Sequence, residues 1–319
     1  MKYSTNTFLE KNQRITYIDY IRAFCIILMI MGHIGFGSVF SLWIHAFHMP
    51  IWFFISGYFC KINRSLKEYA VKKIKNILVP YFIFAVIYIF VFRVLEKQWC
   101  WEGILFPNKI QVPINGAIWF LPAFFITDLI CYLSFKFLPR LSAVALLACV
   151  GIIGSFSIIC LPFSCDSALV GSGFFLCGFL CRKYLRKLLE LSVGKTIILG
   201  IASNIVIFIN SNVNMRENIY GIVPLFWLAA LSMIVFLFNI FIIIMNTKEN
   251  KFFKYIGQNT IIFICTNQLI LFLIEKIIYP HNSIVLLCWK IFELVTVTVV
   301  GSFLDYTLRK TPLKIIIGK

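Results

Sequence analysis

Residues 16–36, TYIDYIRAFCIILMIMGHIGF, form the apolar run that decides the fold. About 20 apolar residues are needed for an α-helix to cross the hydrocarbon core of a bilayer. Runs of similar length recur along the 319-residue chain, which is 61% hydrophobic and 13% charged. An ordinary soluble domain is about half apolar and a quarter charged. The sequence therefore predicts an all-α, polytopic helical bundle in a membrane.

About ten membrane spans are expected, joined by short polar segments. They cover 16–36, 40–60, 77–95, 117–136, 141–162, 167–181, 196–212, 218–246, 256–278 and 283–304. Because no stretch remains for a large soluble part, residues 1–319 are expected to form a single integral-membrane domain. The first run contains Asp19 and Arg22 and lacks a small-residue cleavage site, so we expect a retained helix rather than a secretory signal.

A formal net charge of +17 would suggest nucleic-acid binding in a soluble protein. With a cytoplasmic N-terminus, however, 23 of the 30 Lys and Arg fall on the inner segments. This asymmetry is the positive-inside rule, and an even number of spans then puts both termini in the cytoplasm. Topology and contact with membrane lipids explain the charge, so no nucleic-acid partner is expected. Eleven scattered cysteines without a C-x-x-C pair indicate neither a disulfide framework nor a metal site.

Ionisable side chains inside the expected spans are the candidate functional residues, because exposing them to lipid costs at least a few kcal/mol. Asp19, Arg22 and His33 fall on one stripe of the first helix, about 21 Å long. Such a stripe is typical of the wall of a transmembrane tunnel. His45 and His48 begin the second span near the depth where His33 ends. One histidine alone is as well explained by an interfacial position, but three together predict a shared pocket on the outer side.

Further polar residues are expected to support this site. Pro50 lacks an N–H and can open the second helix just beyond its histidines. Ser56 lies on the helical face of His45, deeper in the membrane. Asp128 in the fourth span and Glu293 in the tenth are buried carboxylates that a purely structural role explains less well.

A basic stretch follows the second span on the cytoplasmic side and contains Lys72, Lys73 and Lys75. Membrane topology alone accounts for most clusters of this kind. A sharper interpretation is that these lysines, beside Arg22, hold the phosphates of a cytoplasmic cofactor at the mouth of the tunnel. Asp19 and Arg22 are equally well explained as a structural ion pair three residues apart on one helix.

Five segments of the chain resemble bacterial membrane acyltransferase family three, especially its fucose 4-O-acetylase-like members. They are YIDYIRAFCIILMIMGHIG (17–35), FHMPIWFFISGYF (47–59), the basic stretch running into ILVPYF (77–82), AIWFLPAFFITDLI (117–130) and FFLCGFLCRK (174–183). The resemblance implies a ten-helix enzyme of the bacterial inner (plasma) membrane. It implies transfer of an acyl group, commonly acetyl, from cytoplasmic acyl-CoA to a sugar hydroxyl of the cell envelope.

The resemblance also assigns roles to individual residues. Asp19 and Arg22 match the family's acidic-basic pair, and His33 matches its first-helix histidine. His48 matches the histidine of the F-H-M-P motif, whereas His45 has no family counterpart.

Two positions depart from the family pattern. The usual arginine pair of the basic stretch is replaced by Lys73 and Asn76, and a histidine often found late in the family is Asn267 here.

These observations lead to a hypothesis for the chemistry. His33 or His48 would act as general base on the sugar hydroxyl, or a histidine would carry the acyl group transiently, and the sequence does not separate the two. The expected co-substrate is acetyl-CoA or another acyl-CoA, without a metal. The expected acceptor is a cell-surface polysaccharide or a lipid-linked sugar. A transporter or flippase for a lipid-linked sugar, and a non-catalytic partner of a polysaccharide synthesis complex, are the alternatives.

Overall fold

The computed structural model describes residues 16–97, 99–107, 116–184, 186–245, 250–276 and 283–319. Regular structure in these ranges is helical, apart from an isolated antiparallel bridge between Asn214 and Ile219. The helices are α1 (Thr16–Ile34), α2 (Ser38–His45), α3 (Pro50–Tyr58), α4 (Leu66–Lys73), α5 (Val79–Glu96), α6 (Glu102–Leu105), α7 (Phe120–Phe137), α8 (Arg140–Gly154), α9 (Cys165–Tyr184), α10 (Val193–Asn210), α11 (Val223–Met245), α12 (Lys251–Gln258), α13 (Thr260–Glu275) and α14 (Ser283–Arg309). The all-α prediction is confirmed.

Eight helical segments in the described ranges are long and apolar enough to cross a membrane. One of them joins α2 and α3, and another joins α4 to α5. Helices α12 and α13 form a ninth segment that bends by 88°, and the apolar helix α8 is shorter, with 15 residues. Helix therefore lies in each of the ten expected ranges, and the chain is a multi-pass membrane protein. Length and composition support eight or nine spans where about ten were expected, because the range 141–162 holds only the short α8.

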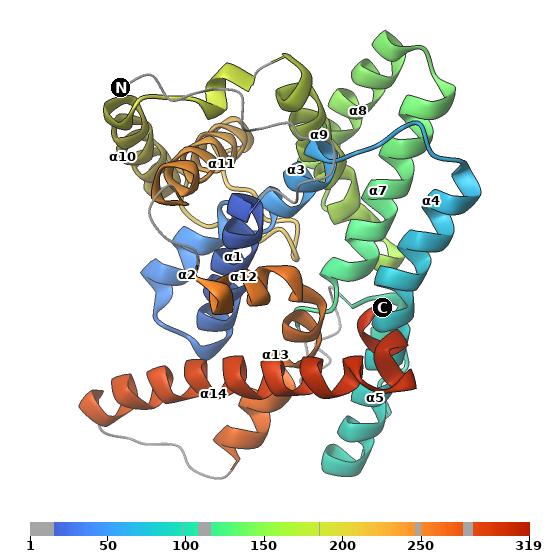
Figure 1. The fold of residues 1–319 in the computed structure, drawn as a ribbon, viewed down its shortest axis with the longest axis vertical. Helices are drawn as coiled ribbons and strands as arrows, with labels where there is room; N and C mark the ends of the chain where they lie inside the picture. Colours follow the sequence, from blue (N-terminus) through green and yellow to red (C-terminus); the bar gives the residue numbers. More distant parts are fainter. Residues whose placement is uncertain (1–15, 98, 108–115, 185, 246–249, 277–282) are drawn as a thin grey trace.

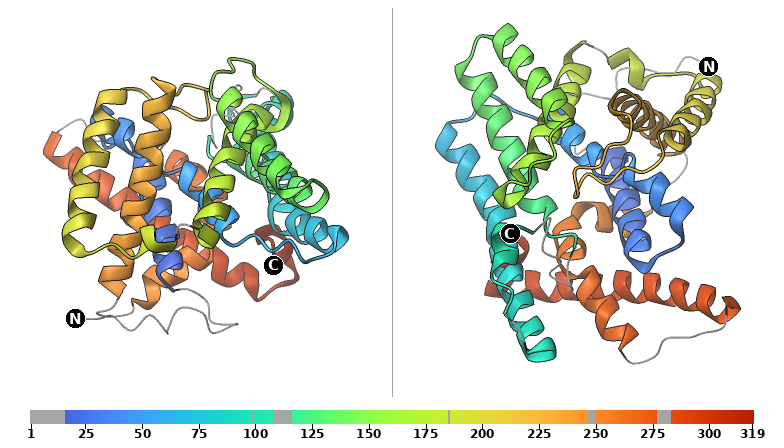
Figure 2. Two further views of the ribbon diagram at one scale, coloured as in Figure 1. Left: turned by 90° about the horizontal axis from the view of Figure 1, so that it is seen from above. Right: turned by 180° about the vertical axis from the view of Figure 1, so that it is seen from behind.

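Helix α1 lies at the centre of the bundle (Figure 1). It packs against α11, α12, α13 and α14, so the first span is surrounded by elements from the C-terminal third of the chain. Helices α4, α5, α7, α8 and α9 form one side of the molecule, and α10 with α11 forms another (Figures 1 and 2). Helix α14 runs across the lower part of the view, where it crosses α13 and packs against it (Figure 1).

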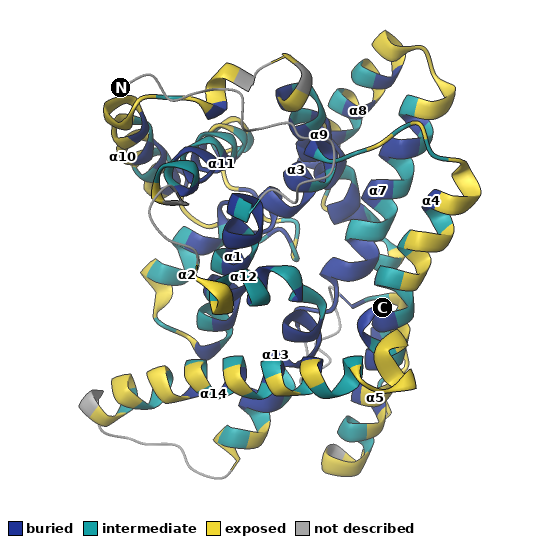
Figure 3. Cartoon of the chain, in the orientation of Figure 1, coloured by how far each residue is buried: buried dark blue, intermediate teal, exposed yellow. Residues whose placement is uncertain are grey.

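The burial pattern separates the central helix from the helices that face lipid. Helix α1 is largely buried, whereas α10 and α14 carry exposed residues along their length (Figure 3). The exposed side chains on α10 and α14 include Ile198, Ile205, Val295 and Phe303, which are apolar. A continuous apolar exterior of this kind is compatible with lipid contact and not with water.

Two glycines let α3 and α9 approach each other closely. A Cβ atom on Gly57 would collide with the backbone carbonyl of Phe175, and one on Gly178 would collide with the carbonyl of Phe54. Small residues at such positions allow membrane helices to pack backbone to backbone. The glycine-rich segment GSGFFLCG, residues 171–178, is thus part of a helix-packing surface.

The second span is interrupted between α2 and α3, where Pro50 is the first residue of α3. Proline has no N–H to donate, so the carbonyl of Ala46 loses its usual helical partner. Residues 46–49 form hydrogen-bonded turns instead of α-helix. The expected opening of this helix beside its histidines is therefore present.

Candidate functional site

Two cavities lie at the two ends of α1. The basic cavity, of about 380 Å³, is lined by Arg22 near the start of α1. The histidine cavity, of about 200 Å³, is lined by His33 near its end. His33 follows Arg22 by eleven helical steps, which corresponds to about 16 Å along the axis. Under the positive-inside topology, the basic cavity is the cytoplasmic one.

Five basic side chains line the basic cavity: Arg22, Lys61, Arg64, Lys72 and Lys73. Three of them were predicted as cofactor-binding residues. Lys61 and Arg64 were not singled out, although they belong to the same basic stretch. The fourth predicted residue, Lys75, is exposed and is not part of the cavity lining, because the chain passes there from α4 into the π-helical turn η2 (Ile74–Leu78). A π-turn changes which side chains face inward, so Asn76 lines the cavity instead.

Lys73 is committed to a buried ion pair. Its ammonium group donates to the carboxylate of Asp128 on α7, which also accepts a hydrogen bond from the hydroxyl of Ser56 on α3. Asp128 is 0% exposed, so these two donors compensate a carboxylate that would otherwise be costly to bury. Ser56 and Asp128 were predicted to support the site, and the structure brings them together at the basic cavity. Ser56 was expected on the helical face of His45 but deeper in the membrane, and the two residues line different cavities.

The histidine cavity is lined by His33 from α1, His45 from the end of α2, and His48 from the break before α3. The rings of His45 and His48 lie 5.2 Å apart, centroid to centroid. The expected convergence of the three imidazoles is therefore present. Among the residues that the structure describes, no group of three histidine, cysteine, aspartate or glutamate side chains is arranged to hold a metal ion.

The tautomer of His48 follows from its hydrogen bond to the backbone. Its Nδ1 lies 2.6 Å from the carbonyl oxygen of Ile44, and His48 is only 4% exposed. A carbonyl oxygen accepts hydrogen bonds and never donates, so Nδ1 carries the proton in the neutral ring. The lone pair then lies on Nε2. Neutral His48 thus has the atom arrangement of a base, with Nε2 as the proton acceptor.

His33 has the opposite tautomer. The backbone N–H of Gly116 donates to Oε1 of Gln268, and this bond turns the amide nitrogen of Gln268 toward His33. That nitrogen, Nε2, lies 2.9 Å from Nδ1 of His33. An amide nitrogen only donates, so Nδ1 of His33 accepts and its Nε2 carries the proton. One cavity therefore combines a ring that accepts at Nε2 with a ring that donates there.

Arg216 adds a guanidinium group to the same cavity. It projects from the turn between α10 and α11, and a Cβ atom on Gly116 would come within 2.6 Å of its Nη1. Burial lowers the pKa of Arg216, but an arginine starts from such a high pKa that it stays charged. Sequence reasoning counted this residue only as one of the few outer charges. The sequence feature that could have identified Arg216 is its place as a lone basic residue in the short segment between two spans, on the side of the membrane where basic residues are scarce.

Two predicted residues lie outside both cavities. Asp19 is buried, accepts a hydrogen bond from Nε2 of Gln258 at 2.9 Å, and lies 3.8 Å from the guanidinium of Arg22. Glu293 is buried on α14 and accepts from Nε1 of Trp289 at 2.8 Å. Neither lines the basic cavity or the histidine cavity. Asp19 joins α1 to α12 and lies beside the cavity-lining Arg22, whereas the bond of Glu293 stays within α14, so a supporting role for either carboxylate stays a prediction.

The stripe on α1 leads to two separate cavities in the described residues, with aromatic side chains between them (the partition). The two cavities share no lining residue. Met49, which lines the histidine cavity, is one helical turn from Trp52, which lines the basic cavity. Trp52 packs against Phe120, with ring centroids 6.2 Å apart, and Trp119 beside it lines the histidine cavity. A helical wheel shows the direction of a polar stripe but not which side chains of other helices lie in front of it. Here bulky aromatic residues fill that space.

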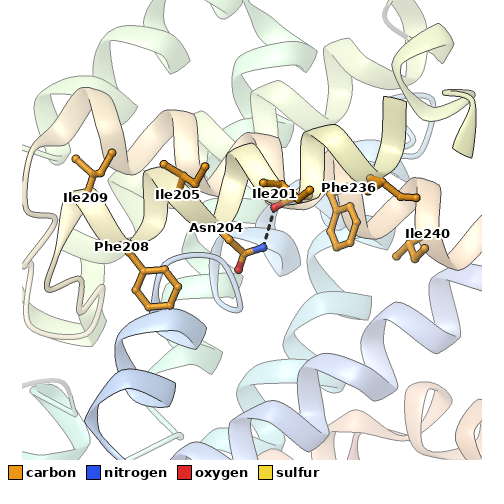
Figure 4. Close-up of a pocket in the computed structure, with 9 residues that line it drawn as sticks. Ile201, Asn204, Ile205, Phe208, Ile209, Phe236 and Ile240 are labelled. Carbon is orange, nitrogen blue, oxygen red and sulfur yellow. Dashed lines mark hydrogen bonds between the residues drawn. The ribbon is translucent and has the colours of Figure 1, made fainter. Parts of the chain in front are cut away.

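A third hollow, of about 790 Å³, is an apolar groove between α10 and α11 (Figure 4). Its polar group is Asn204, whose Oδ1 accepts from Nε1 of Trp43 and whose Nδ2 donates to the carbonyl of Gly200, both at 2.7 Å. Both the oxygen and the nitrogen of this amide already have a partner within the protein, so the groove is mainly apolar. Asn204 thus ties α10 to α2, as an intramembrane asparagine commonly does.

Comparison with known proteins gives one clear finding. A family model for acyltransferase 3, described as an acyltransferase domain, matches residues 15–306. This range includes α1 to α13 and nearly all of α14. A search of the curated proteins gives no match.

Proposed function

The chain belongs to the acyltransferase 3 family and is a multi-pass membrane acyltransferase; we propose that it is an O-acetyltransferase of the bacterial plasma membrane. It takes an acyl group, most commonly acetyl, from cytoplasmic acyl-CoA. It places this group on a hydroxyl of a cell-surface polysaccharide or a lipid-linked sugar. The observation that carries the proposal is the pair of cavities on α1, one basic and one lined by two histidines of opposite tautomer.

The basic cavity is the proposed site for the phosphates of acyl-CoA. Arg22, Lys61, Arg64 and Lys72 line it, and Asp128 neutralises the remaining cation, Lys73. Charge-assisted hydrogen bonds from arginine and lysine are the usual means of binding phosphate. Lys73 then acts on the donor indirectly, by keeping α4 attached to α7.

The histidine cavity is the proposed site of acyl transfer. Nε2 of His48 takes the proton of the sugar hydroxyl while the hydroxyl oxygen attacks the thioester carbonyl carbon. The N–H of His33 stabilises the negative charge that develops on the carbonyl oxygen. The carbon–sulfur bond then breaks, and His48 returns the proton to the departing thiolate of coenzyme A. Direct transfer requires the pantetheine arm to pass the partition at Trp52.

The test is transfer of label by the purified protein in lipid nanodiscs, with labelled acetyl-CoA and envelope polysaccharide as substrates. We expect His48→Ala to lower kcat by about 10²- to 10⁴-fold, as removal of a general base does. His33→Ala is expected to lower kcat by about 10²- to 10³-fold through loss of a donor to the developing oxyanion. Cys149→Ala on the exposed face of α8 is the matched control.

The outcomes separate the alternatives left open by the sequence. Label that reaches a sugar supports an acyltransferase, whereas a transporter or scaffold leaves acetyl-CoA intact. Label trapped on the protein in the absence of sugar, and lost in His48→Ala, favours an acyl-histidine intermediate over direct transfer. Full transfer by both histidine variants contradicts the proposed chemistry. In cells, an O-acetyl signal in the proton NMR spectrum of the surface polysaccharide should disappear on deletion and return on complementation.

A further inference from the structure

No carboxylate of the described residues lines the histidine cavity beside the guanidinium of Arg216, although the charge of Glu217, the next residue, raises the pKa of Arg216. Besides the three imidazoles, the guanidinium is the one ionisable group among the described residues that line this cavity, and no Asp or Glu is among them. Residues 108–115, which precede Gly116, have the sequence NKIQVPIN and contain no acidic residue. No ion pair within 4 Å joins Arg216 to a carboxylate of the described residues, the adjacent Glu217 included.

The turn that carries Arg216 is held in place by its own hydrogen bonds. The backbone of Asn214 pairs with that of Ile219 at 2.7 Å, and its side chain accepts from the backbone N–H of Arg216 at 3.1 Å. The carbonyl of Met215 accepts from the hydroxyl of Ser167 at 2.9 Å. These bonds fix the base of the arginine side chain relative to α9. Gly116 leaves room for the tip, because any larger residue there would meet Nη1.

The guanidinium itself is poorly satisfied by the protein. Its Nε is buried without a hydrogen-bond partner. Its Nη2 lies 3.5 Å from the carbonyl oxygen of Pro107, at the outer limit of a hydrogen bond. An arginine carries five N–H donors in a planar fork, which fits the two oxygens of a carboxylate or phosphate. A buried cation with free donors is therefore complementary to an anionic ligand.

We propose that the acceptor sugar is anionic and that Arg216 binds its carboxylate or phosphate group. This inference rests on the proposed function, since it names the acceptor class of the same site. The anionic group that binds Arg216 does not belong to acyl-CoA. The phosphates of acyl-CoA are assigned to the basic cavity, and its thioester is neutral. The reacting carbonyl already has a donor in His33. At about 200 Å³ the cavity is smaller than pockets for drug-sized ligands, which suits a single sugar unit.

The test compares acceptors that differ only in charge. The full-length protein in nanodiscs receives labelled acetyl-CoA with oligosaccharides that contain glucuronic acid, or with the same oligosaccharides neutralised as carboxyl methyl esters. A third set carries a phosphate ester and separates the two sources of negative charge. We expect the wild type to prefer one anionic set. Arg216→Gln should raise the apparent KM for that set by about 10- to 100-fold, with little change for the neutral esters.

Two further variants keep the test interpretable. Arg216→Lys retains the charge without the planar fork, so it should restore part of the affinity even if the glutamine variant folds poorly. Lys276→Gln removes an exposed cation that lies over the ring of Phe272, outside the cavity, and should leave the preference unchanged. Thermal unfolding without acetyl-CoA gives a second readout. The charged oligosaccharide should stabilise the wild type more than its ester does, and this difference should vanish in Arg216→Gln.

The proposal is overturned if the wild type acetylates charged and neutral oligosaccharides equally well. It is also overturned if Arg216→Gln lowers kcat by the same factor for both, since the guanidinium would then act on the reacting carbonyl. Failure of the proposed function has a different signature. In that case the wild type leaves acetyl-CoA intact with every sugar, and the proposal of an anionic acceptor is contradicted together with the proposed function.

Discussion

The two cavities at the ends of α1 are built in opposite ways. Most of the basic cavity's cations come from one contiguous stretch, residues 61–73, and two of them, Lys61 and Lys72, are exposed. The histidine cavity gathers side chains from α1, α2, α13 and three connecting segments, and hydrogen bonds fix the rings of His33 and His48. Attraction between charges tolerates loose positioning, whereas proton transfer depends on which ring nitrogen holds the proton. We therefore expect substitutions in the two cavities to affect different kinetic constants.

The largest effect on stability is expected at the ion pair between Lys73 and Asp128, which holds one wall of the basic cavity. Asp128→Ala removes the partner of Lys73 and leaves a partly buried cation, which should destabilise the protein by about 3–5 kcal/mol. The measurement is unfolding of the purified protein in detergent.

The double variant Lys73→Met, Asp128→Leu is the matched comparison, because it removes both charges together. It should fold and keep an apparent KM for acetyl-CoA near that of the wild type. A rise of more than about tenfold, the cost of roughly one charge-assisted hydrogen bond, would instead make Lys73 a phosphate ligand.

In the histidine cavity the sharpest substitution is Gln268→Glu. A glutamate still accepts from the N–H of Gly116 but does not donate to His33, so Nδ1 of His33 takes the proton and Nε2 loses it. We expect kcat to fall by about 100-fold, as for loss of one oxyanion donor, with the KM for acetyl-CoA unchanged.

Glu293→Gln is a suitable control, since this buried carboxylate lies outside both cavities. A Gln268→Glu enzyme with wild-type kcat would show that the tautomer of His33 is irrelevant to the rate.

Single charges of the basic cavity should have moderate effects on donor affinity. Arg22→Gln and Lys72→Gln are each expected to raise the apparent KM for acetyl-CoA by about tenfold, with little change in kcat. The effect should shrink at high salt, because exposed charges are screened. Loss of folded protein in Arg22→Gln, without a change in KM, would assign Arg22 to the ion pair with Asp19 alone.

The smallest effect is expected for Lys75→Gln. This lysine is exposed and outside the cavity, so the KM for acetyl-CoA should change by less than about twofold at physiological salt. A change as large as that of Lys72→Gln would mean that the cofactor extends beyond the cavity over η2.

The sequence predicted the membrane fold well, because span length and charge asymmetry depend on local composition. It also brought together His33, His45 and His48, since the order of two adjacent spans sets their depth. It did not identify Arg216 or the role of Gln268. Both residues lie more than 180 positions after His33 in the sequence and reach the site only through the tertiary fold. It placed Glu293 in the site only because burying a carboxylate is costly. In the structure, the indole N–H of Trp289 donates to this carboxylate and compensates part of that cost.

The partition at Trp52 and Phe120 has a consequence for the cell as a whole. A water-filled passage from one face of the membrane to the other would let protons leak and dissipate the proton-motive force. In the described residues, the basic cavity and the histidine cavity share no lining residue, and the rings of Trp52 and Phe120 lie where the two cavities approach each other. We expect this separation to limit proton leak through the resting protein, even though each cavity is large enough to hold water.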